Sequence, residues 1–272
     1  MAVSLTDVGE KNGVVNPWHA AFQRQTRLLE YLRSNLFVDV QVLRDRFGVS
    51  ISTIRRDLTE LENRGLLRRT HGGAVSINQV TYDTENAIRQ VTNVEEKSRI
   101  GEATARLIAE GDTVIIDSGT TSFQVAKRLA KHPSMTFVTN GQDILAVLDA
   151  EGARNIHVIG GEYVSINHSF SGSMAARMVR TFNVDKAILS VTAIDIKRGL
   201  ICTLSPQIAC VQQAMIDVAQ TVIVVADHSK FQRKALSVIA PLEQIDYIVT
   251  DNKTRTVVSS MPEKLKKKFI FA

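Results

Sequence analysis

Apolar residues recur at the spacing of an α-helix in two segments near the start of the chain, which predicts two helices. The apolar positions are Leu28, Leu29, Leu32 and Leu36 in the first segment, and Val42, Leu43 and Phe47 in the second. Gly48 follows the second segment directly, and glycine is the residue that most often ends a helix. We therefore expect a first helix, a short link and a shorter helix that ends at Gly48.

The next segment predicts a third helix with one apolar and one polar face. Its inward-facing positions are Ile54, Leu58 and Leu61, and its outward-facing positions are Ser52, Thr53, Arg55, Arg56 and Thr59. Ser50 or Ser52 can cap the start of this helix, and Gly65 closes its end. The outer face therefore carries hydroxyl groups and a pair of arginines.

Two helices joined by the tight turn "GVS" are typical of a helix-turn-helix, whose second helix enters the major groove of DNA. The following run, "LLRRTHGGAV", alternates in polarity and turns at Gly72 and Gly73, as a β-wing does. Arg68, Arg69 and His71 are placed there to contact DNA phosphates. The alternative is a three-helix packing module with a polar outer face. The arginine pair and the basic wing favour the winged helix-turn-helix.

Beyond Asp112, short apolar runs alternate with helical patterns. The apolar runs are "TVIID", "MTFVT", "IHVIG", "KAILSV", "TVIVVAD", "DYIVTD" and a last "FIF", and the helices lie around 122–131, 142–150, 172–182 and 206–219. Such alternation predicts an α/β domain with a mostly parallel sheet that is covered on both faces. An amphipathic helix in "EEKSRIGEATARLIAEGD" precedes this region. It either covers one face of the sheet or supports dimer contacts.

Polar residues follow the predicted strands, at the edge where parallel sheets bind ligands. They are Asp117 to Thr121 ("DSGTT"), Thr139 to Gly141, Gly160 to Glu162, Asp195, and Asp227 to Lys230. Amides at a helix start, hydroxyl groups and a lysine suit an anionic, polyhydroxylated ligand. Each feature alone has a simpler explanation, because "DSGTT" can be a helix cap and Lys230 a solvated side chain. Their recurrence at successive strand ends favours a ligand site.

The length of the chain and its distribution of charge also indicate two domains. With 272 residues the chain is longer than most single domains, so we expect two. We assign residues 1–19 to a flexible leader, 20–75 to the winged helix-turn-helix, 76–94 to a linker and 95–272 to the α/β domain. Residues 20–73 hold ten arginines, no lysine and six acids, which is +4 of the chain's net charge of +5. A choice of arginine over lysine favours contacts to phosphates or guanine edges.

Several classes of protein are disfavoured. The apolar runs are too short to span a bilayer and the first residues lack a signal-peptide pattern, so we expect a cytoplasmic protein. Cys202 and Cys210 form no metal or disulfide motif, and we interpret both as small buried apolar residues. Neither "GxGxxG" nor "GxxxxGK[ST]" occurs at the strand ends, which disfavours a dinucleotide or nucleoside triphosphate. We expect no cofactor and no metal.

The run "STIRRDLTELENRGLLRRTHGGA" resembles the signature of the DeoR-type bacterial repressors, which bind operator DNA through a winged helix-turn-helix. The resemblance implies operator contacts from Ser52, Thr53, Arg55, Arg56, Arg68, Arg69 and His71. The second half resembles the sensor domain of the same family, with "DSGTT", "VTNG", "GGEY", "FSG", "AID", "AMI" and "ADHSKF" in the family's order.

That sensor is similar in fold to ribose phosphate isomerases and glucosamine phosphate deaminases, and its usual inducers are phosphorylated sugars or sugar acids. The resemblance implies a ligand site made by Asp117, Ser118, Gly119, Thr120, Thr121, Asn140, Gly161, Asp195 and Lys230. The chain departs from the family pattern at Ser122, where threonine is frequent, at Gly141, where serine is common, and near Ile208, where an acid often lies. These changes bear on which ligand is bound.

We therefore expect a repressor of a carbohydrate catabolic operon that a phosphorylated sugar or sugar acid relieves. Its partners would be operator DNA and further copies of the chain, in a homodimer or homotetramer. The alternative is a sugar phosphate isomerase or deaminase with a DNA-binding appendage. That chemistry needs a base and a partner acid, and no second acid accompanies Asp195 in "SVTAIDIKRGL".

Overall fold

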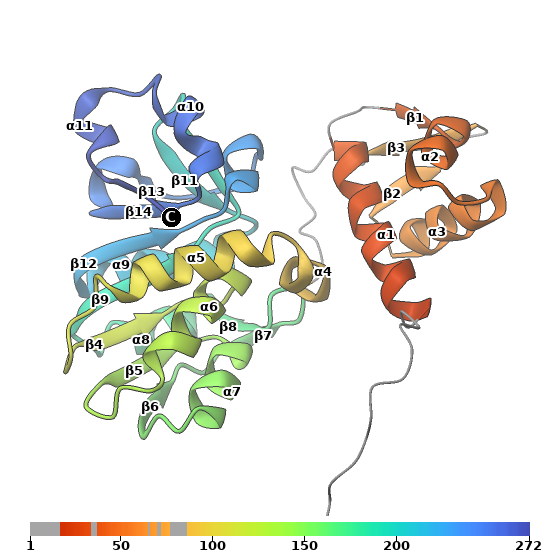
Figure 1. Cartoon of the computed structure of the whole chain (residues 1–272). Coiled ribbons are helices and arrows are strands. Elements are labelled where there is room, and N and C mark those ends of the chain that lie inside the picture. Colours follow the sequence, from red (N-terminus) through yellow and green to blue (C-terminus); the bar gives the residue numbers. More distant parts are fainter. Residues whose placement is uncertain (1–16, 34–36, 65, 70–71, 77–85) are drawn as a thin grey trace, which may run out of the picture. The chain divides into compact units, whose positions relative to one another are not determined.

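The computed structural model describes residues 17–33, 37–64, 66–69, 72–76 and 86–272 (Figure 1). Contacts divide the chain into two units, Met1–Ile77 and Asn78–Ala272, and each is described by itself. Most of the predicted leader, residues 1–16, lies outside the described residues. Residues 17–19, which we assigned to the leader, instead form the start of the first helix, which begins at Pro17. Proline suits this position since its missing N–H would have no partner in the first turn of a helix.

The N-terminal unit is a winged helix-turn-helix, as predicted. Its elements are α1 (Pro17–Arg33), β1 (Phe37–Asp39), α2 (Val40–Phe47), α3 (Ile51–Asn63), β2 (Leu67–Arg69) and β3 (Gly73–Ser76). The three strands form an antiparallel sheet in the order β1-β3-β2. The predicted apolar positions Leu28, Leu29, Leu32, Leu43, Ile54, Leu58 and Leu61 are buried. Val42 is instead 46% exposed, and Leu36 and Gly65 lie outside the described residues.

Local hydrogen bonds fix where the short helices begin and end. Asp39 caps α2 by accepting from the Gln41 amide, and Gly48 ends α2 with a left-handed φ of 63°. Of the two serines that could cap α3, Ser50 is the one that accepts from the Thr53 amide. The turn between α2 and α3 is therefore specified by a glycine and a serine that each meet a backbone requirement.

A buried ion pair joins α1 to α3. Arg24 Nε lies 2.6 Å from Asp57 Oδ2, and Arg24 Nη2 donates to Asp57 Oδ1 at 3.1 Å. Gln25 Nε2 adds bonds to Asp57 Oδ1 at 3.3 Å and to Glu60 Oε2 at 2.9 Å. Asp57 is 2% exposed, so these contacts hold a carboxylate that could not otherwise be buried. They set the position of α3 on α1.

The C-terminal unit is an α/β domain with a seven-stranded parallel sheet. Its strands run in the order β15-β14-β12-β9-β4-β5-β6, and all neighbours are parallel. Their bounds are β4 (Thr113–Ile116), β5 (Thr136–Thr139), β6 (Asn155–Val158), β9 (Val184–Ser190), β12 (Ala219–Val225), β14 (Tyr247–Thr250) and β15 (Phe269–Phe271). Each of these strands was predicted from an apolar run, including the last, "FIF".

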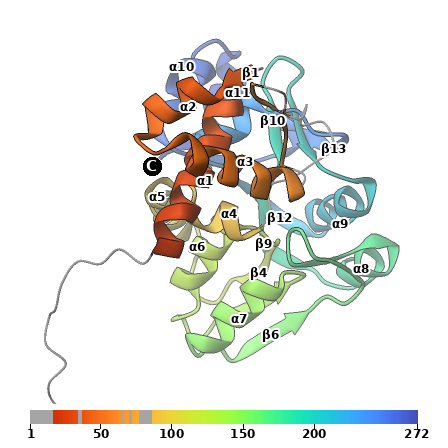
Figure 2. The ribbon, with the colours of Figure 1, turned by 90° about the vertical axis from the view of Figure 1, so that its right-hand side faces the viewer.

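Helices cover both faces of this sheet (Figures 1 and 2). Their bounds are α5 (Val94–Ala105), α6 (Thr120–Leu129), α7 (Gln142–Ala150), α8 (Gly172–Val179) and α9 (Pro206–Asp217), with short α10 (Arg255–Val258) and α11 (Glu263–Lys266) near the end. Side chains of α5, α6 and α7 share one buried cluster with Val114 and Ile116 of β4, whereas α8 and α9 share another with Ile115. This alternation along β4 is the period of two that a strand imposes.

Helix α5 covers one face of the sheet, which was one of its two predicted roles. It packs so closely on α6 that a Cβ added to Gly101 would lie 2.8 Å from the backbone of Gln124. Ile100 is fully buried in the same cluster. The other predicted role, a dimer contact, stays a prediction.

The antiparallel parts of this unit were not predicted. They are a hairpin of β7 (Glu162–Val164) and β8 (Ser169–Ser171), and a small sheet in the order β10-β11-β13, made by β10 (Ala193–Asp195), β11 (Leu200–Thr203) and β13 (Ser237–Pro241). The 3-10 helices η1 (His228–Gln232), η2 (Leu242–Gln244) and η3 (Asn252–Thr254) were not predicted either. Helix α4 (Asn86–Val91) lies within the segment assigned to the linker. None of the helices in the described ranges is long and apolar enough to span a membrane.

The ion pair between α1 and α3 gives a first prediction. Asp57→Ala leaves Arg24 and Gln25 without their buried acceptor, so we expect the free energy of unfolding of the N-terminal unit to fall by about 3 kcal/mol. Trp18, the chain's one tryptophan, lies in α1, so its fluorescence during urea denaturation of the full chain reports this unit. Asp45→Ala is the control, because Asp45 pairs with Arg44 in an exposed pair and its loss should cost less than about 0.5 kcal/mol. Equal losses in the two variants would contradict the assignment.

Candidate nucleic-acid interface and ligand cavity

Helix α3 presents an exposed, cationic face. Ser52, Arg55 and Arg56 are exposed, and Thr53 is half-buried. Among the described residues, neither Arg55 nor Arg56 has an ion-pair partner. The Ser50 hydroxyl lies 2.8 Å from the hydroxyls of Ser52 and Thr53, so this end of the helix carries a linked group of hydroxyls. Two guanidinium groups and a hydroxyl cluster can bind phosphates and base edges.

The wing contributes Arg69 in a fixed position. Arg69 Nη1 donates to Thr59 Oγ1 of α3 at 2.7 Å, and its amide donates to Glu62 Oε1 at 2.8 Å. Its exposed guanidinium is thus held against the outer face of α3. The backbone of Arg68 pairs with Val75 in the wing, but the Arg68 side chain and all of His71 lie outside the described residues. The predicted roles of these residues in DNA binding stay predictions.

In the C-terminal unit, a small cavity of about 30 Å³ lies beside the end of β4. It is lined by residues from α4, β9, β11 and α9 and from the connecting loops, namely Arg89, Asp117, Ser118, Asn167, Ser190, Val191, Thr192, Thr203, Leu204, Ile208 and Gln212. Asp117 and Ser118 are the two predicted ligand residues among them. The cavity lies at the carboxyl ends of the parallel strands, where the sequence placed the ligand site.

A buried carboxyl and a buried amide meet in this cavity. Gln212 Nε2 donates to Asp117 Oδ2 and to the Ser190 carbonyl, both at 2.7 Å. Asp117 is 1% exposed and Gln212 is 2% exposed. Burial raises the pKa of Asp117 to about 7, and the bond from Gln212 offsets part of this effect. Within the described part of the chain, Asp117 Oδ1 and Gln212 Oε1 have no hydrogen-bond partner.

The rest of the "DSGTT" turn is shaped by its neighbours. The Ser118 amide donates to Asn140 Oδ1 at 3.2 Å, and Asn140 Nδ2 donates to the Phe170 carbonyl at 3.1 Å, so Asn140 positions the turn. Gly119 has a φ of 138°, and an added Cβ there would lie 2.5 Å from Ser190 Oγ. Thr120 and Thr121 then begin α6, whose start has no side-chain cap. Its first amides are therefore available to an anion.

Ser122, one of the departures from the family pattern, lies behind the cavity wall. It is fully buried, and its Oγ lies 2.8 Å from the Oγ of Ser190, which lines the cavity. Ile208, at another departure, lines the cavity directly. Cys202 is buried and Cys210 is half-buried, with its thiol donating to the Gln207 carbonyl.

Seven of the nine predicted ligand residues are not part of the cavity lining, and three of these, Gly161, Asp195 and Lys230, also lie outside the "DSGTT" turn and its partner Asn140. Gly161 packs against β8 and α8, where an added Cβ would lie 2.7 Å from the Ser171 carbonyl. Asp195 accepts from the Arg198 amide at 3.1 Å and so stabilises the turn between β10 and β11. Lys230 lies in η1, where its amide donates to the Asp227 carbonyl. The structure thus brings Asp117, Ser118, Asn140 and the start of α6 together, and gives Gly161 and Asp195 local structural roles.

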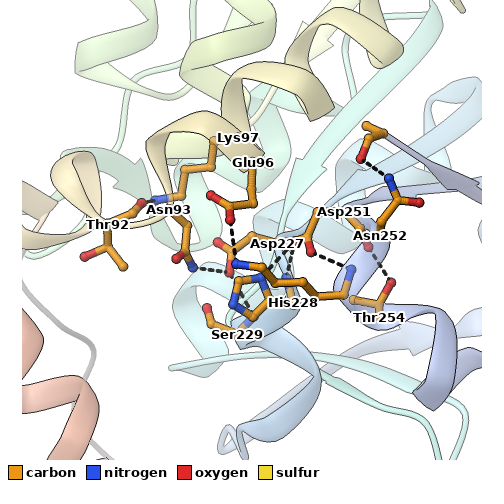
Figure 3. A network of polar contacts seen from close by, with 12 residues as sticks. Thr92, Asn93, Glu96, Lys97, Asp227, His228, Ser229, Asp251, Asn252 and Thr254 are labelled. Atoms are coloured by element: carbon orange, nitrogen blue, oxygen red, sulfur yellow. Dashed lines mark hydrogen bonds and ion pairs between the residues drawn. The ribbon is translucent and has the colours of Figure 1, made fainter.

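A polar network next to the cavity joins η1 to the start of α5 (Figure 3). Asn93 Nδ2 donates to Asp227 Oδ1 at 3.0 Å, and His228 Nδ1 lies 3.0 Å from Asp251 Oδ2. Burial works to raise the pKa of Asp227, but Lys230, Lys97 and hydrogen bonding with Ser229 together outweigh it and hold that pKa well below its ordinary value. Hydrogen bonding to Asp251 raises the pKa of His228.

Lys97 connects this network to the cavity. It is 4% exposed, and burial lowers its pKa to about 8. Its Nζ donates to the Thr92 carbonyl, just after α4 (Figure 3). The same Nζ also donates to the Arg89 carbonyl within α4. Arg89 itself lines the cavity and donates through Nη2 to the Ile166 carbonyl at 2.9 Å. Helix α4 is also held at its start, because the buried Asn86 donates to Asp143 of α7.

Sequence reasoning missed six polar residues of the cavity, Arg89, Asn167, Ser190, Thr192, Thr203 and Gln212. Arg89 lay in the supposed linker, and Thr192 and Thr203 flank antiparallel strands that were not predicted. Gln212 could have been found, because it lies four residues after Ile208 on the same helix and so shares its face. No group of three or more histidine, cysteine or acidic residues in the described ranges could hold a metal ion.

The buried carboxyl gives a prediction about stability and pH. Folded Asp117 keeps its proton up to about pH 7, whereas an unfolded aspartate loses it near pH 4, so the free energy of unfolding falls as the pH rises between these values. We expect Asp117→Asn to stabilise the C-terminal unit at pH 8, on the order of 2 to 4 kcal/mol, and to have little effect at pH 4. Calorimetric thermal unfolding at both pH values checks this, with the exposed Asp149→Asn as the control. A pH-independent effect would contradict it.

Comparisons with known proteins agree with both units. Residues 24–80 match the DeoR-like helix-turn-helix domain, and residues 92–252 match the DeoR C terminal sensor domain. The chain is 51% identical over 249 residues to the transcriptional repressor AccR of Agrobacterium fabrum, covering 92% of this chain and 96% of that protein. It is 33% identical over 233 residues to the glycerol-3-phosphate regulon repressor of Escherichia coli, covering 84% and 90%.

Among solved structures, ribose 5-phosphate isomerase A of Methanocaldococcus jannaschii is similar at 10% identity and a TM-score of 0.39, over 52% of this chain and 55% of that one. This likeness is too distant to support an argument about function. The matches to both domains and the identity to the two repressors decide the family. The chain belongs to the DeoR family of helix-turn-helix transcriptional regulators.

Proposed function

We propose that this protein represses a carbohydrate catabolic operon and that a phosphorylated sugar or a sugar acid relieves the repression. The observation that carries the proposal is the cavity of the sensor domain, beside which two buried oxygens, Asp117 Oδ1 and Gln212 Oε1, have no hydrogen-bond partner among the described residues. Leaving buried polar atoms unpaired lowers stability, so a polar ligand at this cavity is favoured.

The DNA-binding half of the proposal rests on α3. Arg55 and Arg56 are exposed next to the hydroxyl cluster at the start of the helix, and Arg69 is held beside them by Thr59. An exposed pair of guanidinium groups on the second helix of a helix-turn-helix suits guanine edges and phosphates in a major groove. Ser52, Thr53, Arg68 and His71 complete the proposed contact set. A homodimer or homotetramer would place two such helices on paired half-sites.

The effector half rests on the sensor domain and on the names of relatives. The start of α6 offers backbone amides to an anion, and Arg89 adds a cation at the cavity. A relative named for the glycerol-3-phosphate regulon supports an effector of this chemical kind. The effector would act by binding one arrangement of the protein more tightly than the other, since only differential affinity can shift such an equilibrium.

The alternative of an active isomerase or deaminase is less well supported. Proton transfer on a sugar phosphate needs a base and a separate acid at the reacting carbons. Asp117 is the only carboxyl among the described residues that line the cavity, and no histidine or lysine lines it. Asp195 accepts a hydrogen bond within the turn between β10 and β11. The relatives are also named as repressors. We infer that the ligand is sensed and not converted.

Arg55 and Arg56 provide the test of the DNA interface. Arg55→Ala or Arg56→Ala should lower operator affinity by about 1 to 3 kcal/mol, because each removes a guanidinium contact to a base edge or phosphate. Gel-shift titration against a DNA fragment selected by the wild-type protein measures this. Arg106→Ala is the control, since Arg106 is exposed on the sensor domain and, among the residues that the structure describes, pairs with Glu102 of α5. Unchanged operator affinity in both test variants would rule out α3 as the recognition helix.

A second prediction concerns the effector. Lys230→Ala and Thr120→Ala should leave operator affinity unchanged but abolish effector-driven release, because both remove groups proposed to hold the anion. A thermal-shift screen of sugar phosphates and sugar acids identifies binders, and calorimetry with each hit compares the variants. Lys234→Ala, which changes an exposed lysine nearby, is the control. Unaltered ligand affinity in both test variants would remove these two residues from the site.

A further inference from the structure

Strand β6 forms one edge of the seven-stranded sheet. It pairs with β5 from Asn155 to Val158, and among the described residues no strand pairs with its outer side (Figure 2). An edge of this kind presents unpaired backbone groups, which proteins usually protect with a lysine, a proline, a bulge or a covering segment. The four residues of β6, "NIHV", include neither a lysine nor a proline. This edge is therefore open to pairing with another strand.

The backbone groups of Ile156 and Val158 point away from β5. The register places Thr139 of β5 beside Val158, and the Ile159 amide donates to the Thr139 carbonyl at 2.8 Å. In a parallel ladder a residue bonds to the two neighbours of its partner, so the groups of His157 and Ile159 face β5. Successive residues alternate in direction. The N–H and C=O groups of Ile156 and Val158 therefore face outwards.

Exposed apolar side chains flank this edge. Val158 is 37% exposed, and Met174 and Met178 of α8 are 67% and 39% exposed. The two methionines lie one helical turn apart, on the same face of α8. The Gly160 amide donates to Met178 Sδ at 3.5 Å, which places Met178 beside the end of β6. Apolar side chains that gather around unpaired backbone groups are typical of a protein interface.

The outward groups of β6 fit those of a second copy of the chain. When two copies of β6 run antiparallel about a two-fold axis at His157, Ile156 of each copy faces Val158 of the other. Each outward N–H and C=O group of the strand then has a partner across the axis. The side chains of Ile156 and Val158 form apolar cross-strand pairs on one face of the joined sheet.

The charges at the two ends of β6 favour this antiparallel arrangement. Arg154 precedes the strand, Glu162 follows it, and both are exposed. No ion pair joins either of them to another described residue. Across the axis, Arg154 lies opposite Gly160 of the other copy, and Glu162 follows that glycine by at most about 7 Å of chain. Parallel pairing would instead bring like charges together.

We propose that β6 is the dimer interface of the sensor domain, at which two copies join edge to edge through antiparallel β6 strands with His157 on the two-fold axis. Met174 and Met178 extend the contact beyond the strand. This inference rests on the proposed function for the oligomer alone, to which that function assigns no surface.

Disulfide cross-linking of the full chain tests the position of the axis. Antiparallel residues that face each other without exchanging hydrogen bonds have Cα atoms about 4.5 Å apart, a distance that a disulfide can span. After oxidation with diamide, His157→Cys should therefore run mostly as a covalent dimer on a non-reducing gel. Asn155→Cys is the matched control, because its two copies lie about 13 Å apart across the axis. It should cross-link no more than the wild-type chain, which has two cysteines of its own.

Sedimentation velocity over a range of protein concentrations measures the same interface without a cross-link. His157→Glu brings two carboxylates together on the axis, so the dissociation constant of this contact should rise about tenfold or more. His132→Glu is the control, since it makes the same substitution at an exposed histidine just after α6 and should leave association unchanged. The cross-link remains an independent measurement if His157→Glu fails to fold.

Three results would overturn the interface: no cross-link above the wild-type level in His157→Cys, equal cross-linking in Asn155→Cys, or unchanged association of folded His157→Glu. A wild-type oligomer that persists beside any of them leaves the proposed function intact and moves its assembly to another surface. A wild-type chain that stays monomeric at every concentration, both free and on operator DNA, contradicts the interface and also the oligomer of the proposed function.

Discussion

The sensor domain depends on the parallel pairing of β4 with β9. Ile116 pairs with Ile188, and the Asp117 amide continues the ladder by donating to the Ile188 carbonyl at 2.9 Å. β4 ends at this point and β9 continues to Ser190, so Asp117, directly after β4, lies near the end of β9. Gln212 of α9 then bridges the two strand ends through a single amide nitrogen. The cavity, its acceptors and the glycine at position 119 all follow from this alignment.

The same alignment of strands buries two polar groups at the cavity, where burial is unfavourable for both of them. The cavity holds a carboxyl whose charged form is disfavoured and an amide oxygen with no donor among the described residues. The surrounding clusters of valine, isoleucine and alanine can tolerate this cost because hydrophobic burial over the two faces of the sheet is the larger contribution. Binding sites commonly give up local stability in this way. The N-terminal unit shows the opposite case, since its buried Asp57 is fully compensated by Arg24 and Gln25.

The sequence predicted features that depend on local spacing. Apolar runs marked all seven parallel strands, because strands covered on both faces need apolar residues at nearly every position; β6, at the edge of the sheet, is mostly exposed. The helices of the winged unit followed from the spacing of Ile54, Leu58 and Leu61. The antiparallel strands were missed because they are short and lack that signature. The partner of Asp117 was missed because Gln212 lies 95 residues away in sequence, and no local pattern connects them. Gly161 and Asp195 lie in turns where they have local structural contacts, and their roles as ligand residues stay predictions.

Helix α4 has a mechanical consequence. It spans only six residues, yet it is fastened at both ends: Asn86 donates to Asp143 at its start, and the Arg89 carbonyl accepts from Lys97 near its end. Residue 86 lies one helical turn, about 4.5 Å, from the arginine that lines the cavity. Any displacement of Arg89 along the helix axis is therefore shared by Asn86 and, through the hydrogen bond that Asn86 donates, is passed to Asp143 of α7.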